Sequence, residues 1–275
     1  MDQLSSIRKP AVAGTFYPRE KVQLQNEIKL MLDLAKSDFD ISKRIFGLIV
    51  PHAGYIYSGK TAAAAYNLIK GKSISTVIIL SPSHREYFPG ICVFNGDAYE
   101  TPLGTVKINE EIRAKLLENS KSIFAGSNGH KAEHAIEVHI PFLQIVLGEF
   151  TLVPITIGDQ SKNYLDELAE KISEISDGGI LIIASTDLSH FYTHDEAEQL
   201  DSKIEKYIAD YDPDGLQKAL DEGKCEACGG GAVVALLKAA KKENFNNVKI
   251  LSRTNSGDVT GDFSEVVGYL SAAIY

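Results

Sequence analysis

The chain has 275 residues, of which 44% are hydrophobic and 24% charged, so its composition is that of a globular protein with a large core. Its formal net charge is −9, and its lysines and arginines are scattered among acidic residues, which argues against a nucleic-acid binding surface. No apolar stretch approaches the length of a membrane span, and residues 1–4 lack the basic and apolar regions of a signal peptide, so we expect a cytoplasmic protein with no membrane partner.

Apolar runs predict strands, and amphipathic segments between them predict helices. Helices are expected at residues 21–36, 59–70, 109–118, 136–147, 164–176, 196–209 and 231–242. Strands are expected at 45–50, 76–80, 151–157, 180–184, 248–251 and 266–274, and several do not alternate in polarity, as is typical of strands buried on both faces. The glycines and prolines of 91–108 indicate short strands and turns beside the sheet.

This succession predicts the α/β class. We expect a single three-layer domain over residues 1–275, with a central mostly parallel or mixed β-sheet flanked by helices. No flexible linker or internal repeat divides the chain.

Polar residues and a proline mark several helix starts. Ser58, Asn109 and Ser161 are each placed to cap a predicted helix. Pro141 either kinks the predicted helix at 136–147 or lies in the first turn of a helix that starts later.

Two histidines follow predicted buried strands. His52 comes after the strand at 45–50 and His84 after the strand at 76–80, each within two residues of a proline. The carboxyl ends of such strands meet in one crevice, and strands consecutive in sequence are usually adjacent in the sheet. The two imidazoles are therefore expected to meet and to form part of a metal site. The alternative is that each histidine only hydrogen-bonds within a tight turn.

A third strand end carries an acid and an imidazole. Asp187 and His190 follow the strand at 180–184. A carboxylate that accepts a hydrogen bond from an imidazole N–H fixes the tautomer of that ring, so we expect Asp187 to orient His190. The alternative is that Asp187 caps the turn that follows.

A further group of histidines and glutamates lies between residues 130 and 139. It does not match the His-Glu-x-x-His zinc pattern, because the glutamate precedes its histidine. We expect His130 and His139 to belong to a solvated polar turn. His134 and Glu137 are the members that could line a pocket.

Three cysteines are too few for a disulfide framework and fit a reducing compartment. Cys92 lies in an apolar run and is expected in the core. Cys225 and Cys228 form a single Cys-x-x-Cys, without the second pair of a zinc ribbon. Cys228 touches a glycine run before a predicted helix, where aligned amide dipoles favour a thiolate, so it is the better metal ligand. Thiol redox chemistry by the pair is the alternative.

Taken in order, these motifs resemble those of the Memo family. The resemblance begins at residues 9–18 and extends to the last predicted strand. It rests on Pro-His-Ala-Gly-Tyr, Pro-Ser-His, Glu-His-Ala-Ile-Glu-Val-His-Ile-Pro, Ser-Thr-Asp-Leu-Ser-His and Cys-Gly, at residues 51–55, 82–84, 133–141, 185–190 and 228–229. The resemblance implies a fold similar to class III extradiol dioxygenases. It also implies that iron or copper binds to His52, His84 and Cys228, with Asp187, His190 and His134 in the same pocket.

The implied ligands differ from those of non-haem iron oxygenases, which use two histidines and a carboxylate. A thiolate suits iron or copper redox chemistry, so catechol cleavage does not follow from the fold. The leading hypothesis is a metal-dependent redox protein in which His190 moves protons, Asp187 orients it and His134 contacts substrate or oxygen. The alternatives are an adaptor that binds a small molecule or peptide without turnover, and a metallohydrolase built on a three-ligand zinc site.

Partner proteins are implied by the resemblance alone. Microbial members of the Memo family are often called AmmeMemoRadiSam system protein B. That name implies a functional link to AMMECR-like and radical SAM proteins.

Overall fold

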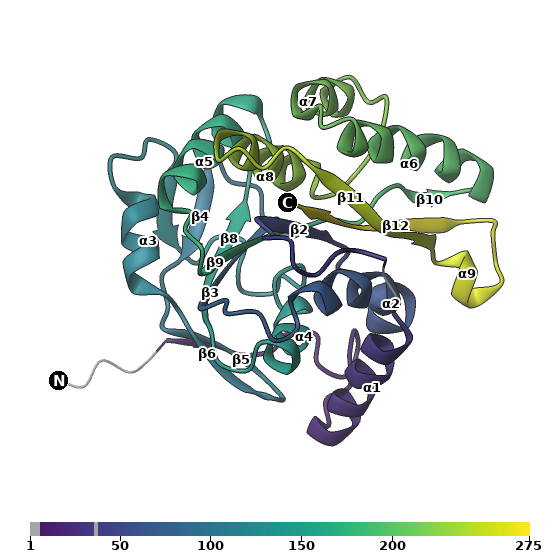
Figure 1. Ribbon diagram of the computed structural model, residues 1–275, viewed down its shortest axis with the longest axis horizontal. Helices are drawn as coiled ribbons and strands as arrows, with labels where there is room; N and C mark the ends of the chain where they lie inside the picture. The colour runs from purple at the N-terminus through teal and green to yellow at the C-terminus, as the bar shows by residue number, and fades with distance from the viewer. Residues whose placement is uncertain (1–5, 36–37) are drawn as a thin grey trace.

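The computed structural model describes residues 6–35 and 38–275, and a nine-stranded sheet runs through it (Figure 1). The strands of this sheet are β2 (Gly47–Val50), β3 (Thr76–Pro82), β4 (Ile91–Phe94), β7 (Ile123–Gly126), β8 (Thr151–Ile157), β9 (Ile180–Ser185), β10 (His190–Tyr192), β11 (Val248–Asn255) and β12 (Val266–Ile274). Their order is β10-β12-β2-β9-β3-β8-β4-β7, and β11 pairs with β12. The strands β2, β9, β3 and β8 are parallel, whereas β12 is antiparallel to β2 and β4 to β8, so the sheet is mixed.

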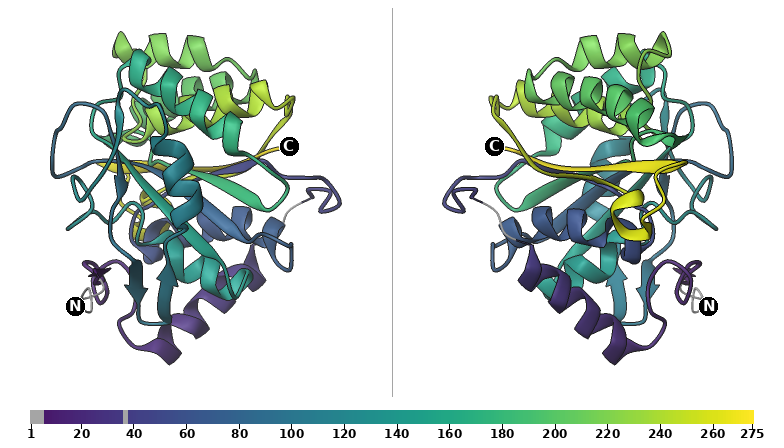
Figure 2. Two further views of the ribbon diagram at one scale, coloured as in Figure 1. Left: turned by 90° about the vertical axis from the view of Figure 1, so that its left-hand side faces the viewer. Right: turned by 90° about the vertical axis from the view of Figure 1, so that its right-hand side faces the viewer.

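Helices cover both faces of this sheet (Figure 2). One face packs against α1 (Lys21–Leu34), α2 (Tyr55–Tyr66) and α4 (His139–Val146), and the other against α3 (Glu110–Leu117), α5 (Lys162–Ile175), α6 (His194–Ala209), α7 (Pro213–Asp221) and α8 (Gly230–Lys242). Alternate side chains of β3 point to opposite faces of the sheet, so both faces need a covering layer. Val77 and Ile79 join the core under α1 and α2, whereas Ile78 and Leu80 join the core under α5 and α8. The predicted three-layer α/β architecture is confirmed.

Smaller elements complete the fold. The short strands β1 (Ile7–Arg8), β5 (Ala98–Thr101) and β6 (Gly104–Lys107) form a separate sheet, so most of the segment 91–108 is short strands and turns, as predicted. The 3-10 turn η1 (Asn67–Ile69) follows α2, and α9 (Gly257–Thr260) lies between β11 and β12. The elements β1, β7, β10, α7 and α9 were not predicted, because most of them are too short to show a hydrophobic period.

The helix starts correct some of the predictions. Asn109 caps α3 by accepting a hydrogen bond from the Ile112 N–H at 3.0 Å, as expected. Ser161 precedes α5 without a side-chain cap bond. Ser58 does not cap α2, which begins at Tyr55, and its hydroxyl donates to the Ala53 carbonyl instead.

Two further boundaries follow from the described helices. The helix α4 begins at His139, so Pro141 lies in its first turn, where a missing N–H costs nothing. The helix α1 ends at Leu34, and residue 36 of the predicted helix lies outside the described residues, as do residues 1–4.

The prediction that β2 and β3 are neighbours is wrong. The strand β9 lies between them and pairs in parallel with both. The carboxyl ends of β2, β9 and β3 therefore meet side by side, and the loop after β9 lies between the two histidine loops. This order fits the expectation of one domain, because strands from residues 47 to 274 share one sheet.

No helix of the described residues is long and apolar enough to cross a membrane.

Candidate metal centre

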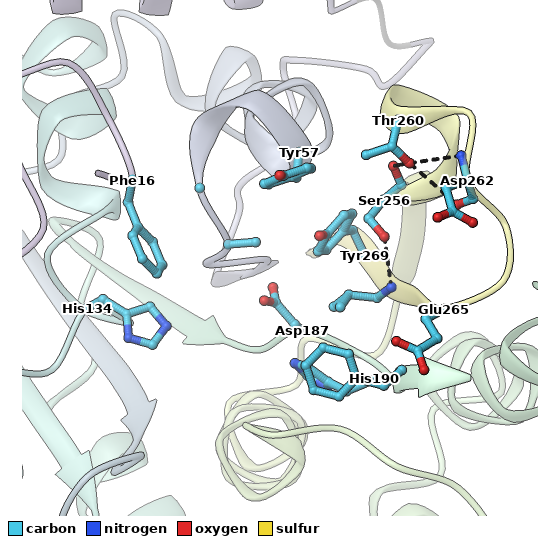
Figure 3. Close-up of a pocket in the computed structure, with 14 residues that line it drawn as sticks. Phe16, Tyr57, His134, Asp187, His190, Ser256, Thr260, Asp262, Glu265 and Tyr269 are labelled. Atoms are coloured by element: carbon cyan, nitrogen blue, oxygen red, sulfur yellow. Dashed lines mark hydrogen bonds between the residues drawn. The ribbon is translucent and has the colours of Figure 1, made fainter. Parts of the chain in front are cut away.

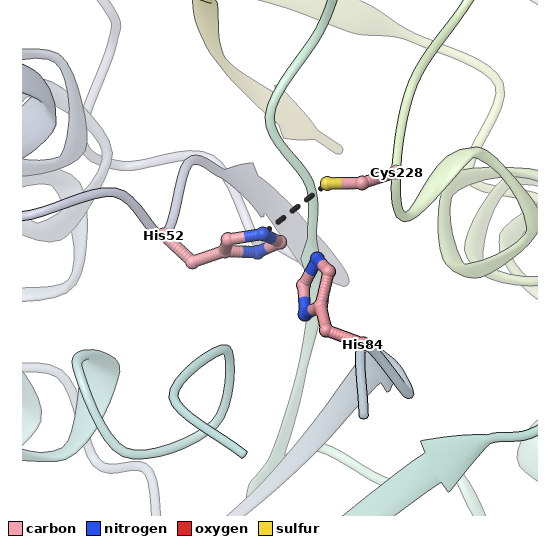
Figure 4. Close-up of side chains that lie close together, drawn as sticks. All are labelled: His52, His84 and Cys228. Atoms are coloured by element: carbon pink, nitrogen blue, oxygen red, sulfur yellow. Dashed lines mark hydrogen bonds between the residues drawn. The ribbon is translucent and has the colours of Figure 1, made fainter. Parts of the chain in front are cut away.

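Three side chains from distant parts of the chain converge at this edge of the sheet (Figure 4). His52 follows β2, His84 follows β3, and Cys228 precedes α8. The His52 Nε2 lies 3.2 Å from the Cys228 Sγ, and one donor atom from each of the three lies within 4.8 Å of the others. Metal–nitrogen bonds of about 2.0–2.1 Å and metal–sulfur bonds of about 2.3 Å set the donors of one ion roughly 3–4 Å apart. The three residues thus fit a shared transition-metal ion.

Ser185 fixes which nitrogen of His52 carries the proton. The Ser185 hydroxyl donates its single hydrogen to the Ala135 carbonyl at 2.7 Å, so it can only accept from the imidazole His52 Nδ1 at 2.7 Å. His52 is 1% exposed, and burial holds its pKa well below the usual value, so the ring is neutral. Its Nε2 therefore presents a lone pair toward the Cys228 Sγ.

Glu133 does the same for His84. The Glu133 carboxylate accepts from the His84 Nδ1 at 2.9 Å and from the His84 backbone N–H at 2.7 Å. Burial raises the pKa of Glu133, but the hydrogen bonds and charge of His84 outweigh burial and lower it to about 2. An ionised carboxylate can only accept, so the His84 Nδ1 carries the proton and Nε2 is left as the free donor atom. Sequence reasoning assigned no role to Glu133 or Ser185, although both lie inside the motifs at 133–141 and 185–190.

The Cys228 sulfur is held against the loop that follows β9. The Asp187 backbone N–H donates to the Cys228 Sγ at 3.2 Å, and the Cys228 N–H donates to the Asp187 carbonyl at 3.3 Å. Burial, and after it the Asp187 charge, raises the pKa of this thiol, whereas backbone hydrogen bonds of Asp187 and of Gly229, at the start of α8, lower it without outweighing burial. A Cβ on Gly229 would lie 2.0 Å from the Ser185 carbonyl oxygen, so only glycine allows this close approach.

The other two cysteines lie apart from this cluster. Cys92 is fully buried in β4, as predicted for a core residue. Cys225 lines a different cavity, together with Gln160 and Gln217, and burial raises its pKa. All three thiols are free.

The expectation that His130 and His139 are solvated is wrong. His139 donates from Nε2 to the Ser185 hydroxyl at 2.8 Å and accepts from the Tyr66 hydroxyl at Nδ1. His130 is fully buried, with Nδ1 bonded to the Tyr99 hydroxyl at 2.8 Å. Both rings are held in the core by hydrogen bonds that cross between elements.

Glu137 also differs from its prediction. It is fully buried and forms an ion pair with Arg8 instead of lining the pocket. The Glu137 carboxylate further accepts from the backbone N–H groups of Ala11 and Val12 and from the Tyr17 hydroxyl. The N-terminal segment is thereby fastened over the histidine-rich turn, a contact across 129 residues that no local pattern reveals.

A cavity of about 450 Å³ adjoins the three-residue cluster (Figure 3). The predicted residues His134, Asp187 and His190 all line it. His134 stacks on His84 with ring centroids 4.7 Å apart, so it lies between the cavity and the candidate metal centre. The remaining lining side chains are mostly aromatic or acidic: Phe16, Tyr57, Phe191, Tyr269, Asp262 and Glu265.

The expected pairing of Asp187 with His190 is not what the structure shows. The Asp187 Oδ1 instead accepts the His52 backbone N–H at 2.8 Å, because β9 lies beside β2 and brings the loop of Asp187 against that of His52. Burial raises the pKa of Asp187 to about 7. His190 bonds to the Leu188 backbone, and burial lowers its pKa, so its ring is neutral near pH 7.

Comparison with known proteins identifies the family. The Memo-like protein family model matches residues 8–273. A MEMO1 family protein of Thermoplasma volcanium is 41% identical, covering 96% of this chain and 97% of the relative. One from Thermotoga maritima is 40% identical, covering 98% and 99%. The crystal structure of an uncharacterised Escherichia coli K12 protein matches with a TM-score of 0.49 and 14% identity, over 84% of this chain and 100% of that one. The chain belongs to the Memo-like protein family.

Proposed function

We propose that the chain binds one iron or copper ion through the His52 Nε2, the His84 Nε2 and the Cys228 Sγ, and carries out redox or oxygen chemistry on a small molecule. The observation that carries this proposal is the hydrogen bonding of the two imidazoles to Ser185 and Glu133, which keeps the proton on each Nδ1, so that both Nε2 lone pairs are available as ligands and the His52 Nε2 already lies 3.2 Å from the Cys228 Sγ. The bound ion would supply electron transfer. Because the third donor is sulfur, catechol ring cleavage is not part of the proposal.

The remaining residues act on the substrate and its protons. The cavity beside the cluster holds the substrate next to His134. The Asp187 carboxylate keeps the His52 loop in position through the backbone. His190 uses one ring nitrogen for its bond to Leu188 and offers the other to the cavity as a proton acceptor.

Anaerobic reconstitution tests the metal site. We expect the full chain to take up about one Fe(II) or Cu(I) per chain, measured by elemental analysis after gel filtration. Cys228→Ser should weaken binding at least about tenfold, because a hydroxyl is a poor ligand for these ions. The matched control is Cys225→Ser, which removes a thiol outside the cluster and should bind as the parent protein does.

The outcomes separate the competing functions. The proposal fails if the parent protein has no affinity for either ion, or if the two serine variants bind equally well. Zinc binding with hydrolysis, and no affinity for iron or copper, would instead support the metallohydrolase. Metal binding without oxygen consumption or turnover would support an adaptor. The functional link to AMMECR-like and radical SAM proteins stays a prediction that rests on the family resemblance alone.

A further inference from the structure

We propose that the cavity beside the candidate metal centre selects a small aromatic amine, with its ammonium group held by Glu265 and its ring against Tyr57 and Phe191. This inference rests on the proposed function, because it assumes that the cavity holds the substrate. It goes further by naming the chemical class of that substrate.

Charge is the first observation. The cavity lining includes the exposed carboxylates of Asp262 and Glu265, beside the buried Asp187, but no lysine or arginine among the described residues. The Glu265 carboxylate is exposed and makes no hydrogen bond or ion pair within residues 6–35 and 38–275, whereas Asp262 accepts from the Ser264 N–H and hydroxyl. A phosphate or carboxylate ligand would therefore meet like charge, and an ammonium group would meet a free partner.

The shape and walls of the cavity are the second observation. Four aromatic rings line it: Phe16, Tyr57, Phe191 and Tyr269. Aromatic faces attract organic cations as well as other rings. Asp187 is 4% exposed, and its carboxylate points into the cavity from the floor (Figure 3). A volume of about 450 Å³ suits a ligand with a single ring and a short side chain.

Phe191 is the third observation, because its position is costly for the fold. Its backbone is left-handed, with φ of 63°, and its side chain is 72% exposed. It lies at the irregularity in the pairing of β10 with β12, between His190 and Tyr192. A bulky residue gains nothing from such a backbone or from such exposure, and bulges of this kind redirect side chains next to binding sites. The structure assigns Phe191 as a platform for the ligand ring.

Three probes of similar size test the charge preference: tyramine, the neutral 4-ethylphenol and the anionic 4-hydroxyphenylacetate. Calorimetric titration of the full chain, without oxygen and both before and after Fe(II) loading, should show tyramine binding at least about tenfold more tightly than the acid. Glu265→Gln should weaken tyramine binding about fivefold and leave 4-ethylphenol unchanged. Phe191→Ala should weaken binding of all three probes.

The matched control is Glu118→Gln, which removes an exposed charge at the end of α3 and should change nothing. Equal affinity for tyramine and 4-hydroxyphenylacetate would overturn the proposal, as would absence of tyramine binding at millimolar concentration. Equal effects of Glu265→Gln and Glu118→Gln would overturn it too. Because tyramine binding is measured without metal as well as with it, failure here is distinct from failure to bind iron or copper.

Discussion

Glu133 is a single buried residue that organises much of the candidate site. It is 1% exposed, and its carboxylate accepts from the side chain and backbone of His84 and from the backbone N–H groups of His134 and Ala135. The ring and loop of His84 and the turn that carries His134 therefore depend on one carboxylate. A carboxylate behind a ligating histidine raises the basicity of that ligand and fixes its orientation.

Glu133→Gln should weaken metal binding about 10- to 100-fold. The groups around the Glu133 carboxylate are all N–H donors, so the NH₂ group of a glutamine would face other donors and could not accept their hydrogen bonds. Affinity for Fe(II) is measured by competition with a chromophoric chelator. The control is Glu100→Gln, which removes a half-exposed carboxylate paired with Lys9. A Glu133→Gln protein that binds within twofold of the parent would show that His84 does not need this partner.

Gly229→Ala should also weaken metal binding, at least about tenfold, without changing any ligand. Its new Cβ would collide with the Ser185 carbonyl oxygen and push Cys228 away from His52. Gly178→Ala is the control, since a Cβ there meets nothing within 4 Å. The same chelator assay reports the result, and equal affinity of the two alanine variants would contradict it.

At the scale of elements, the sequence predicted the bounds of several strands but not which strands lie next to each other in the sheet. Unbroken apolar runs placed β8 and β12 at their observed bounds, and the motifs named all three candidate ligands. The order β2-β9-β3 could not be read, because adjacency depends on long crossovers and not on local pattern. The bonds of Ser185 to His52 and of Glu133 to His84 were missed for the same reason, since they span 133 and 49 residues.

Glu167, on α5, ties the turn before β7 to that helix. Its carboxylate accepts from the hydroxyls of Ser120 and Ser122 and from the backbone N–H groups of Lys121 and Ser122. Burial raises the pKa of Glu167, but these hydrogen bonds outweigh burial and lower it to about 2.

Glu167→Gln should lower the free energy of unfolding at pH 7 by about 1–2 kcal/mol. The folded pKa lies below the unfolded value of about 4.3, so this stabilisation is full above about pH 5 and fades as the pH falls toward 2. Urea unfolding of parent and variant between pH 7 and 3.5 should show the gap closing. A gap that stays constant would mean that the carboxylate charge is not responsible.

At the scale of the whole molecule, the N-terminal segment is a strap across the histidine-rich turn. Arg8 is buried, ion-paired with Glu137, and donates to the carbonyls of His130 at 3.1 Å and Glu133 at 2.5 Å. Residues near the start of the chain thereby support a turn that carries Glu133 and His134. We therefore expect folding of the site to be coupled to docking of the strap.

Arg8→Met should lower the free energy of unfolding by about 3 kcal/mol, because it leaves the buried Glu137 carboxylate without its cation. Lys9→Met is the control, since its partner Glu100 is half-exposed and such pairs contribute less than about 1 kcal/mol. Chemical denaturation measures both. Where Arg8→Met does not fold, Arg8→Lys, which keeps a cation beside Glu137, should retain folding with a smaller loss. Equal losses for Arg8→Met and Lys9→Met would refute the coupling.

The pairing of β12 with β2 joins two strands that are far apart in sequence, so we expect the sheet to be completed late during synthesis. The strand β12 pairs with β2 on one side and with β10 and β11 on the other. At roughly 5–20 residues per second, β2 emerges many seconds before its partner has been translated. During that interval the apolar edge Gly47–Val50 has no neighbour on that side and can pair with another nascent chain. We expect chaperones that bind nascent chains to occupy this edge.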